Sequence, residues 1–495
     1  MSAPADLETI SKKVARERWG FLPNRAVKLI HFANGFFRAL SGRDGSSELL
    51  FNAVRSGRHR PTNEQFVRDA RAHLEFSSGY EDPDALRPVR TALERTLNQD
   101  SAAYGSLRFH SFTASHWQHT SADPSDNSSG RFMAQVLAAR SDDATPSGAD
   151  LVEALRALLR RPDDLYRLTV PFLDSDDEMG PPPDPPAEAD APVRRLTNSL
   201  EAPLHALQEA VARLVVRADE AEKTAALQRL ATLGGFGIFL HLVNATHEAL
   251  EAGQRVPLLL CKKPPRASMR DASRRTFVLA RQRLARTFEE GLAAELRRRG
   301  QDDLAPDAYT SLMRDWLVQA DMSDAARERA TQQLAQFKED FAAEREGTDD
   351  RLDAFVRAAV PTCLESMATG SSSCRPSGCA VRISTHSGLL GPFRGGGEKY
   401  YRPAPQFLDL LAAILLQPGE ALSSDDFWER AHDRFGLLCG ARGRRDAEIL
   451  REYGVLQVSV EHLRENADAL HDQLTRLGHA RTYADGVTYV EYDAF

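Results

Sequence analysis

The chain has 495 residues, of which 42% are hydrophobic and 27% charged, and 71 acidic against 63 basic residues give a net charge of −8. This length allows several domains with large cores, and 31 glycines and 26 prolines exclude a collagen-like or wholly disordered chain. The apolar run Phe407 to Leu416 is about half of the ~20 residues that a membrane span needs. The polar N-terminus is unlike a signal or transit peptide. We therefore expect a soluble, cytoplasmic protein with no membrane partner.

The first 173 residues predict a mostly helical N-terminal domain. Helical spacing covers residues 63–74, 85–97 and 149–159, with polar loops between them. Residues 174–192 then contain six prolines and seven acids, a composition that cannot bury enough surface to fold. We expect residues 174–193 to form an acidic, proline-rich linker.

Residues 194–367 predict a helical middle domain, because apolar residues recur every three or four positions. The expected helices cover residues 204–215, 226–233, 237–252, 272–299 and 324–346. The pair Gly234-Gly235 is expected to end the second of these helices, and residues 256–260 to form a short strand.

The strongest charge feature of the sequence is the segment from residue 262 to residue 286, with a local net charge of +8 and Asp271 as its single acid. Its basic residues are Lys262, Lys263, Arg266, Arg270, Arg274, Arg275, Arg281, Arg283 and Arg286. Arginines that neutralise phosphates release counterions, so the cluster favours salt-sensitive, sequence-independent binding to nucleic acid. The alternatives are an acidic partner surface, the acidic linker of this chain, or a solvated helix face.

The five cysteines are an odd number, and we expect them to be reduced thiols. Cys363, Cys374, Cys379 and His386 carry zinc-ligand chemistry around a connector at residues 368–400 that is rich in glycine and serine, although their spacing departs from the usual paired knuckles. A zinc- or thiol-dependent enzyme is therefore an alternative. The glycine-rich run before Lys399 does not meet the P-loop pattern, because Tyr400 follows the lysine. We expect no cofactor and no catalytic residues.

Residues 401–495 predict four helices followed by a hairpin. The helices cover residues 405–416, 425–434, 445–453 and 460–477, the last capped by Ser459 and ended by Gly478. Strands at 480–483 and 487–492 flank an Asp-Gly turn. This order is typical of a winged helix-turn-helix domain.

The fourth helix of this region would be the recognition helix of the winged-helix domain. Its expected outward residues include Glu465, Asn466, Asp468 and His471, and its acids favour protein docking or dimerisation over base reading. The arginines before the third helix are candidate contacts to a DNA backbone; they are Arg442, Arg444 and Arg445.

Residues 385–426 read THSGLLGPFRGGGEKYYRPAPQFLDLLAAILLQPGEALSSDD. With the helices and wing that follow, this layout resembles accessory subunits of bacterial phage-defence islands, of the methylation-associated or phosphorothioation-dependent kind. The resemblance covers roughly a quarter of the chain, lies in layout rather than in a fixed motif, and carries over no functional residues. It implies a non-catalytic subunit that couples a motor ATPase partner to DNA.

Together these features predict a mainly α, multidomain protein with a winged-helix-like C-terminal domain. The expected function is that of a non-enzymatic antiviral defence subunit that contacts DNA, a motor ATPase, or both. A winged-helix transcriptional regulator is the alternative with the same C-terminal fold.

Overall fold

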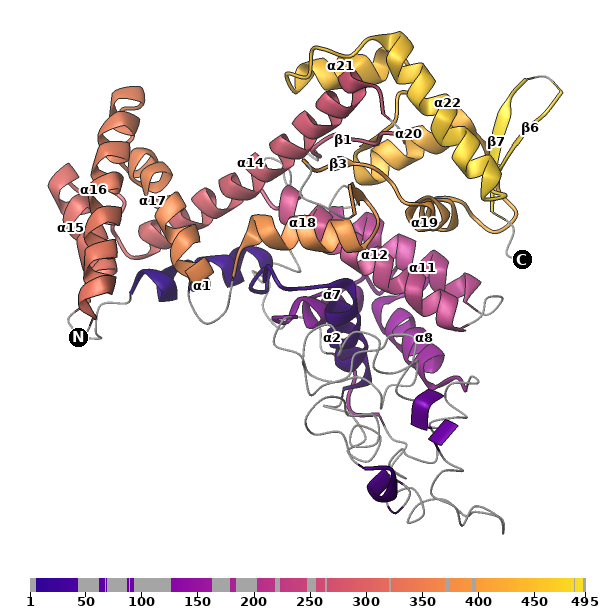
Figure 1. The fold of residues 1–495 in the computed structure, drawn as a ribbon, viewed down its shortest axis with the longest axis horizontal. Coiled ribbons are helices and arrows are strands. Elements are labelled where there is room, and N and C mark those ends of the chain that lie inside the picture. The colour runs from indigo at the N-terminus through magenta and orange to yellow at the C-terminus, as the bar shows by residue number, and fades with distance from the viewer. Residues whose placement is uncertain are drawn as a thin grey trace.

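The computed structural model describes residues 6–42, 62–66, 68, 87–88, 90–92, 126–162, 179–183, 203–218, 223–246, 255–262, 265–319, 322–369, 374–393, 398–484 and 486–492. Within these residues the fold is mainly helical, as the sequence predicts, with a few small sheets (Figure 1). The helices before residue 300 are α1 (Leu7–Trp19), α2 (Leu29–Ser41), α7 (Ser129–Ala138), α8 (Gly148–Arg160), α11 (Pro203–Arg217), α12 (Lys223–Asn244) and α14 (Ala267–Arg298). The later helices are α15 (Pro306–Leu317), α16 (Asp324–Gly347), α17 (Arg351–Thr369), α18 (Pro376–His386), α19 (Pro405–Leu415), α20 (Ser424–Phe435), α21 (Arg444–Glu452) and α22 (Val460–Arg476).

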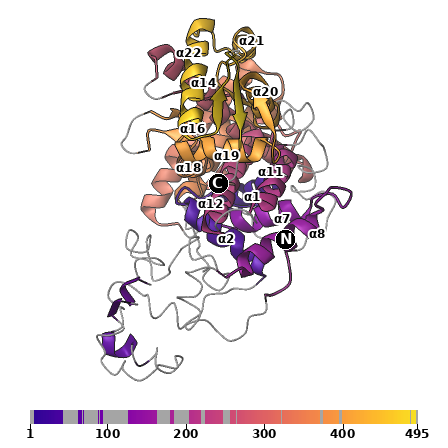
Figure 2. The same cartoon turned by 90° about the vertical axis from the view of Figure 1, so that its right-hand side faces the viewer.

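One large hydrophobic cluster packs most of these helices together, and a second, smaller cluster joins α21 and the first turns of α22 to the start of α14. The large cluster contains buried residues from Leu7 in α1 to Tyr492 near the end of the chain, including residues of all three expected domains. Viewed from the side, α21 and α22 lie at one end of the molecule and α2 and α8 lie toward the other, with α12 between them (Figure 2). The division at residues 173 and 367 stays a prediction.

Local signals account for the ends of several helices. At α1, the Asp6 carboxylate accepts a hydrogen bond of 2.6 Å from the Thr9 amide, and Gly20 ends the helix with a φ of 76°. Ser459 caps α22 by accepting from the His462 amide at 3.1 Å, and Gly478 follows the helix with a φ of 81°. The predicted ends of α22 are therefore confirmed.

Helix α12 differs from its prediction, because Gly234 and Gly235 lie inside the helix and do not end it. A Cβ at Gly234 would lie 2.3 Å from the Phe32 ring, and one at Gly235 would lie 2.8 Å from a methyl group of Leu29. The two glycines therefore let α2 approach α12 closely. Tertiary packing, and not a chain break, explains this glycine pair.

By length and composition, α12 is apolar enough to cross a membrane. From the sequence we considered only the shorter run at residues 407–416 and did not identify this helix. However, 83% of its most apolar stretch is buried inside the protein, as in the core helix of a globular fold. The helix is weak evidence on localisation either way, and the cytoplasmic location stays a prediction.

The C-terminal region brings the small sheets together. Strand β4 (Ala421–Ser423) pairs with β7 (Thr488–Glu491), which also pairs with β6 (Ala480–Thr482), so the antiparallel order is β4-β7-β6. The predicted hairpin is thus confirmed. Strand β1 (Leu258–Leu259) pairs in parallel with β5 (Leu437–Leu438), and β2 (Leu390–Gly391) pairs with β3 (Tyr400–Tyr401). The β1–β5 pair joins the middle of the chain to the C-terminal region.

Candidate functional site

The predicted basic segment lies on and just before α14, except that Lys263 falls outside the described residues. The helix buries the expected apolar stripe of Phe277, Leu284 and Phe288. Four arginines of the segment are exposed along the helix: Arg270 and Arg281 border one edge of its exposed side, and Arg275 and Arg286 border the other. We call these four residues the α14 basic face.

Carboxylates of the same chain neutralise part of the basic segment. Arg266 pairs with Glu465 of α22, Arg274 with Glu398, Arg270 with Asp271 at 3.6 Å, and Arg286 with Glu289 at 3.3 Å. Among the described residues, no carboxylate lies within ion-pair distance of Lys262, Arg275 or Arg281. Arg283 lies over the Tyr453 ring at 6.0 Å. The α14 basic face therefore keeps positive charge that the described chain does not balance.

Helix α22 packs its first turns against the start of α14. His462 shares a hydrogen bond of 2.9 Å with the Ser268 hydroxyl, and Glu465 accepts from Arg266. These contacts turn the beginning of the expected recognition helix toward the protein.

Asn466 is buried, and its expected outward position is therefore wrong. Its amide donates 2.8 Å hydrogen bonds to the carbonyls of Leu260 and Cys439, and its oxygen accepts from the Lys262 amide at 2.8 Å. Asn466 thus satisfies backbone groups at the ends of the β1–β5 pair. Two of the three partners, Leu260 and Lys262, are 206 and 204 residues away in the sequence, and no local sequence signal reveals such contacts.

The three arginines near α21 have different environments. Arg442 is largely buried and donates to Asp446 at 2.8 Å, while Asp446 also accepts from the Gly440 amide at 2.9 Å. Arg445 pairs with Glu429 at 2.6 Å, and Arg444 is exposed with no ion pair among the described residues. Arg442 therefore stabilises the loop before α21, and only Arg444 carries charge with no carboxylate beside it in the described chain.

The zinc and thiol alternative gains no support from the structure. All five cysteines are buried. Burial raises the thiol pKa of Cys261, Cys363 and Cys374 to about 12, and raises those of Cys379 and Cys439 as well. In the part of the chain that the structure describes, no three His, Cys, Asp or Glu side chains are grouped as metal ligands. The thiols are neutral at physiological pH and poor nucleophiles.

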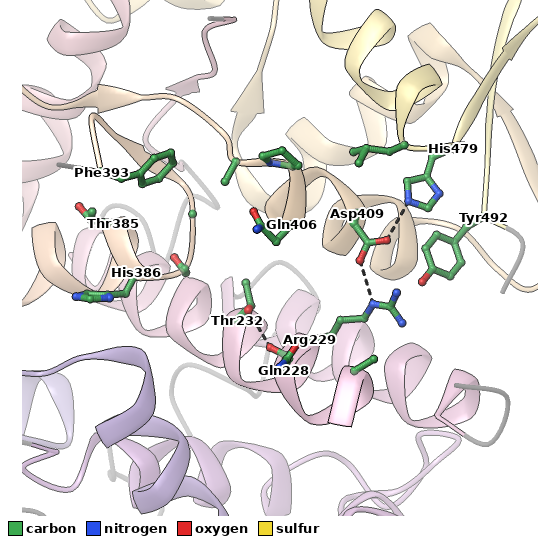
Figure 3. Close-up of a pocket in the computed structure, with 16 residues that line it drawn as sticks. Gln228, Arg229, Thr232, Thr385, His386, Phe393, Gln406, Asp409, His479 and Tyr492 are labelled. Atoms are coloured by element: carbon green, nitrogen blue, oxygen red, sulfur yellow. Dashed lines mark hydrogen bonds and ion pairs between the residues drawn. The ribbon is translucent and has the colours of Figure 1, made fainter. Parts of the chain in front are cut away.

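A cavity of about 850 Å³ lies between α12, the turn after α18, α19 and the C-terminal hairpin, and the sequence analysis did not anticipate it. Asp409, His479 and Tyr492 lie at one end, and Thr385, His386 and Phe393 lie at the other (Figure 3). His386, a candidate zinc ligand, thus lies on the wall of this cavity.

Asp409 carries a negative charge at one end of the cavity. It accepts a hydrogen bond of 3.0 Å from Arg229 of α12 and shares one of 2.9 Å with His479. Burial raises the pKa of Asp409, but the hydrogen bonds from His479 and Arg229 outweigh burial and hold this pKa below its ordinary value. His479 stacks on Tyr492 with ring centroids 5.0 Å apart. The resulting cluster links α12, α19 and the end of the chain.

No protein-family model, no curated protein and no solved structure matches this chain.

Proposed function

We propose that this protein is a non-catalytic, cytoplasmic subunit of a bacterial antiviral defence system that contacts the backbone of duplex DNA. The single observation that carries the DNA contact is the α14 basic face. Arg270 and Arg281 are eleven residues apart, or about 16 Å along a helix at 1.5 Å per residue. This length is comparable with the ~12 Å width of the DNA major groove, so the face can reach several phosphates.

The α14 basic face also argues against recognition of a specific DNA sequence. Arginine contacts to phosphates fix position but carry little sequence information. In the first turns of α22, His462 and Glu465 already contact Ser268 and Arg266, so these two side chains are not available to base edges. We therefore propose sequence-independent DNA binding and favour it over the transcriptional regulator.

The C-terminal region supports a docking role. Helices α19, α20 and α22 with the sheet order β4-β7-β6 follow the order of a winged helix, with α21 as an additional helix. We propose that this module binds a protein partner, a motor ATPase of the same system. The antiviral assignment itself depends on the resemblance of residues 385–426.

The test uses a triple variant, Arg270→Gln, Arg275→Gln and Arg281→Gln. Glutamine keeps helix propensity, so the fold should be retained while three charges are lost. We expect affinity for duplex DNA to fall equally for unrelated sequences, and the slope of log affinity against log salt to become shallower by up to about 2.7 units.

A matched control removes three charges from the exposed arginines of α16, with Arg327→Gln, Arg329→Gln and Arg345→Gln. This control should bind DNA like the unmodified protein. If both triple variants change the salt slope equally, the effect is one of net charge and the α14 basic face is not the contact. If DNA binding is unchanged but the ATPase no longer co-purifies, the face binds an acidic protein.

A further inference from the structure

A second, smaller cavity carries an excess of positive charge. Its volume is about 210 Å³, and it lies where the loop between α7 and α8, helix α11 and the turn after α19 meet. The polar side chains that line it are Arg140, Thr145, Glu209, Arg213 and Gln417. We call it the Arg140 pocket.

Arg140 is the most unusual group in this pocket. Only 9% of the residue is exposed, yet its Nε and Nη1 atoms have no hydrogen-bond partner among the described residues. Burial lowers the pKa of Arg140, and the charge of Glu209 partly opposes this effect. A buried guanidinium with unused donors is costly, and such a group is normally paired with an anion.

The neighbouring charges do not supply enough anions. Glu209 is the one carboxylate that lines the pocket, and it already accepts from Arg213 at 3.4 Å and from Arg434 of α20. Three guanidinium groups therefore surround one carboxylate, a local net charge of +2. The pKa of Arg213 reflects this crowding of positive charge, because burial and the nearby Arg434 lower this pKa to about 10.

We propose that the Arg140 pocket binds a phosphate group. The planar fork of an arginine matches two phosphate oxygens, and phosphate accepts more hydrogen bonds than a carboxylate can. The Arg140 and Arg213 guanidinium groups, the Thr145 hydroxyl and the Gln417 amide line the pocket and supply its N–H and O–H donors. Its volume suits one phosphoryl group with part of an ester rather than a strand of nucleic acid. The site is separate from the α14 basic face and does not depend on the proposed function.

The bound phosphate would connect distant parts of the chain. Arg140 comes from the expected N-terminal domain, Arg213 from the middle domain and Gln417 from the C-terminal domain. A ligand that binds only the folded protein stabilises it by mass action. Phosphate should therefore raise the thermal unfolding midpoint of the full-length protein.

The experiment measures thermal unfolding and calorimetric binding of the full-length protein with inorganic phosphate, against chloride at equal ionic strength. Arg140→Gln should weaken phosphate binding at least about tenfold, since it removes a charge-assisted hydrogen bond. Without phosphate, this variant should be as stable as the unmodified protein or more stable, because a buried unpaired charge is lost. Arg140→Lys should bind with intermediate affinity.

Glu209→Gln provides a variant with the opposite expected sign, because removal of the competing carboxylate should strengthen phosphate binding. Arg345→Gln, which removes an exposed charge from α16, should leave the affinity unchanged. The proposal is overturned if phosphate stabilises no more than chloride, if acetate stabilises equally, or if Arg140→Gln binds phosphate as tightly as the unmodified protein.

Two further probes identify the source of the phosphate. A nucleoside monophosphate that displaces inorganic phosphate identifies a nucleotide ligand, and tighter binding of a 5′-phosphorylated than of an unphosphorylated oligonucleotide identifies a DNA end. If inorganic phosphate alone binds, the ligand is the free anion. Each of these results supports the phosphate site, provided that Arg140→Gln abolishes the binding that the probe measures.

Discussion

Replacement of Asp409 by asparagine should weaken the fold in a pH-dependent way. The carboxylate holds Arg229 and His479, and the exposed fractions of the three side chains are 26%, 27% and 7%. The cluster is thus intermediate between a surface pair, worth about 0 to 1 kcal/mol, and a buried pair, whose disruption costs about 3 to 5 kcal/mol. We expect Asp409→Asn to lower the free energy of unfolding by about 2 kcal/mol at neutral pH.

The pH dependence follows from the depressed pKa of Asp409 in the folded protein. Its stabilising contribution is present above the unfolded pKa of about 3.9 and is lost as the pH falls through the folded pKa. The difference in stability between the unmodified protein and Asp409→Asn should therefore shrink as the pH falls below about 4.

Urea unfolding followed by circular dichroism over a series of pH values measures this difference. Asp303→Asn is a suitable control, because the Asp303 side chain is 98% exposed and its removal should change stability little. A stability difference for Asp409→Asn that is absent at neutral pH, or that is the same at every pH, would refute the reasoning.

Three more predictions concern packing and the thiols. Leu470→Asp and Leu474→Asp should each unfold the C-terminal region, since both leucines are fully buried, whereas the exposed Thr475→Asp should not; thermal unfolding separates these outcomes. Gly130→Ala should destabilise by about 2 kcal/mol or more, since its Cβ would lie 2.2 Å from the Phe36 backbone nitrogen, while Gly347→Ala, with open space around it, should stabilise by about 0.5 kcal/mol. The buried thiols should react with a thiol reagent only after denaturant is added, and rapid labelling of the native protein would contradict their raised pKa values.

Local signals explain why the C-terminal region could be predicted from the sequence. Ser459 caps α22, leucines recur along one side of the helix, and the sequence Asp-Gly occurs between β6 and β7. Each of these signals acts within a few residues. The apolar stripe of α14 was predicted on the same basis. The winged-helix interpretation and the DNA contact stay predictions.

The polar clusters could not be predicted, because their members are distant in sequence. Arg229 and Asp409 are 180 residues apart, and Arg213 donates to a carbonyl 201 residues away. The glycine pair in α12 was misinterpreted for a related reason: the rings and methyl groups that require glycine there belong to α2. Sequence spacing indicates which residues share a helix face, but it does not indicate which distant segment of the chain packs against that face.

The position of α1 has a consequence for the order in which the chain can fold during synthesis. Helix α1 packs against α14 and α17, and Lys13 pairs with Glu295 across a separation of 282 residues. A ribosome releases the N-terminus first, so Leu7, Ile10 and Val14 must wait for more than half of the chain before their partners exist. Their apolar side would be exposed throughout that interval, and the burial of α1 therefore depends on contacts that form late and between distant parts of the chain.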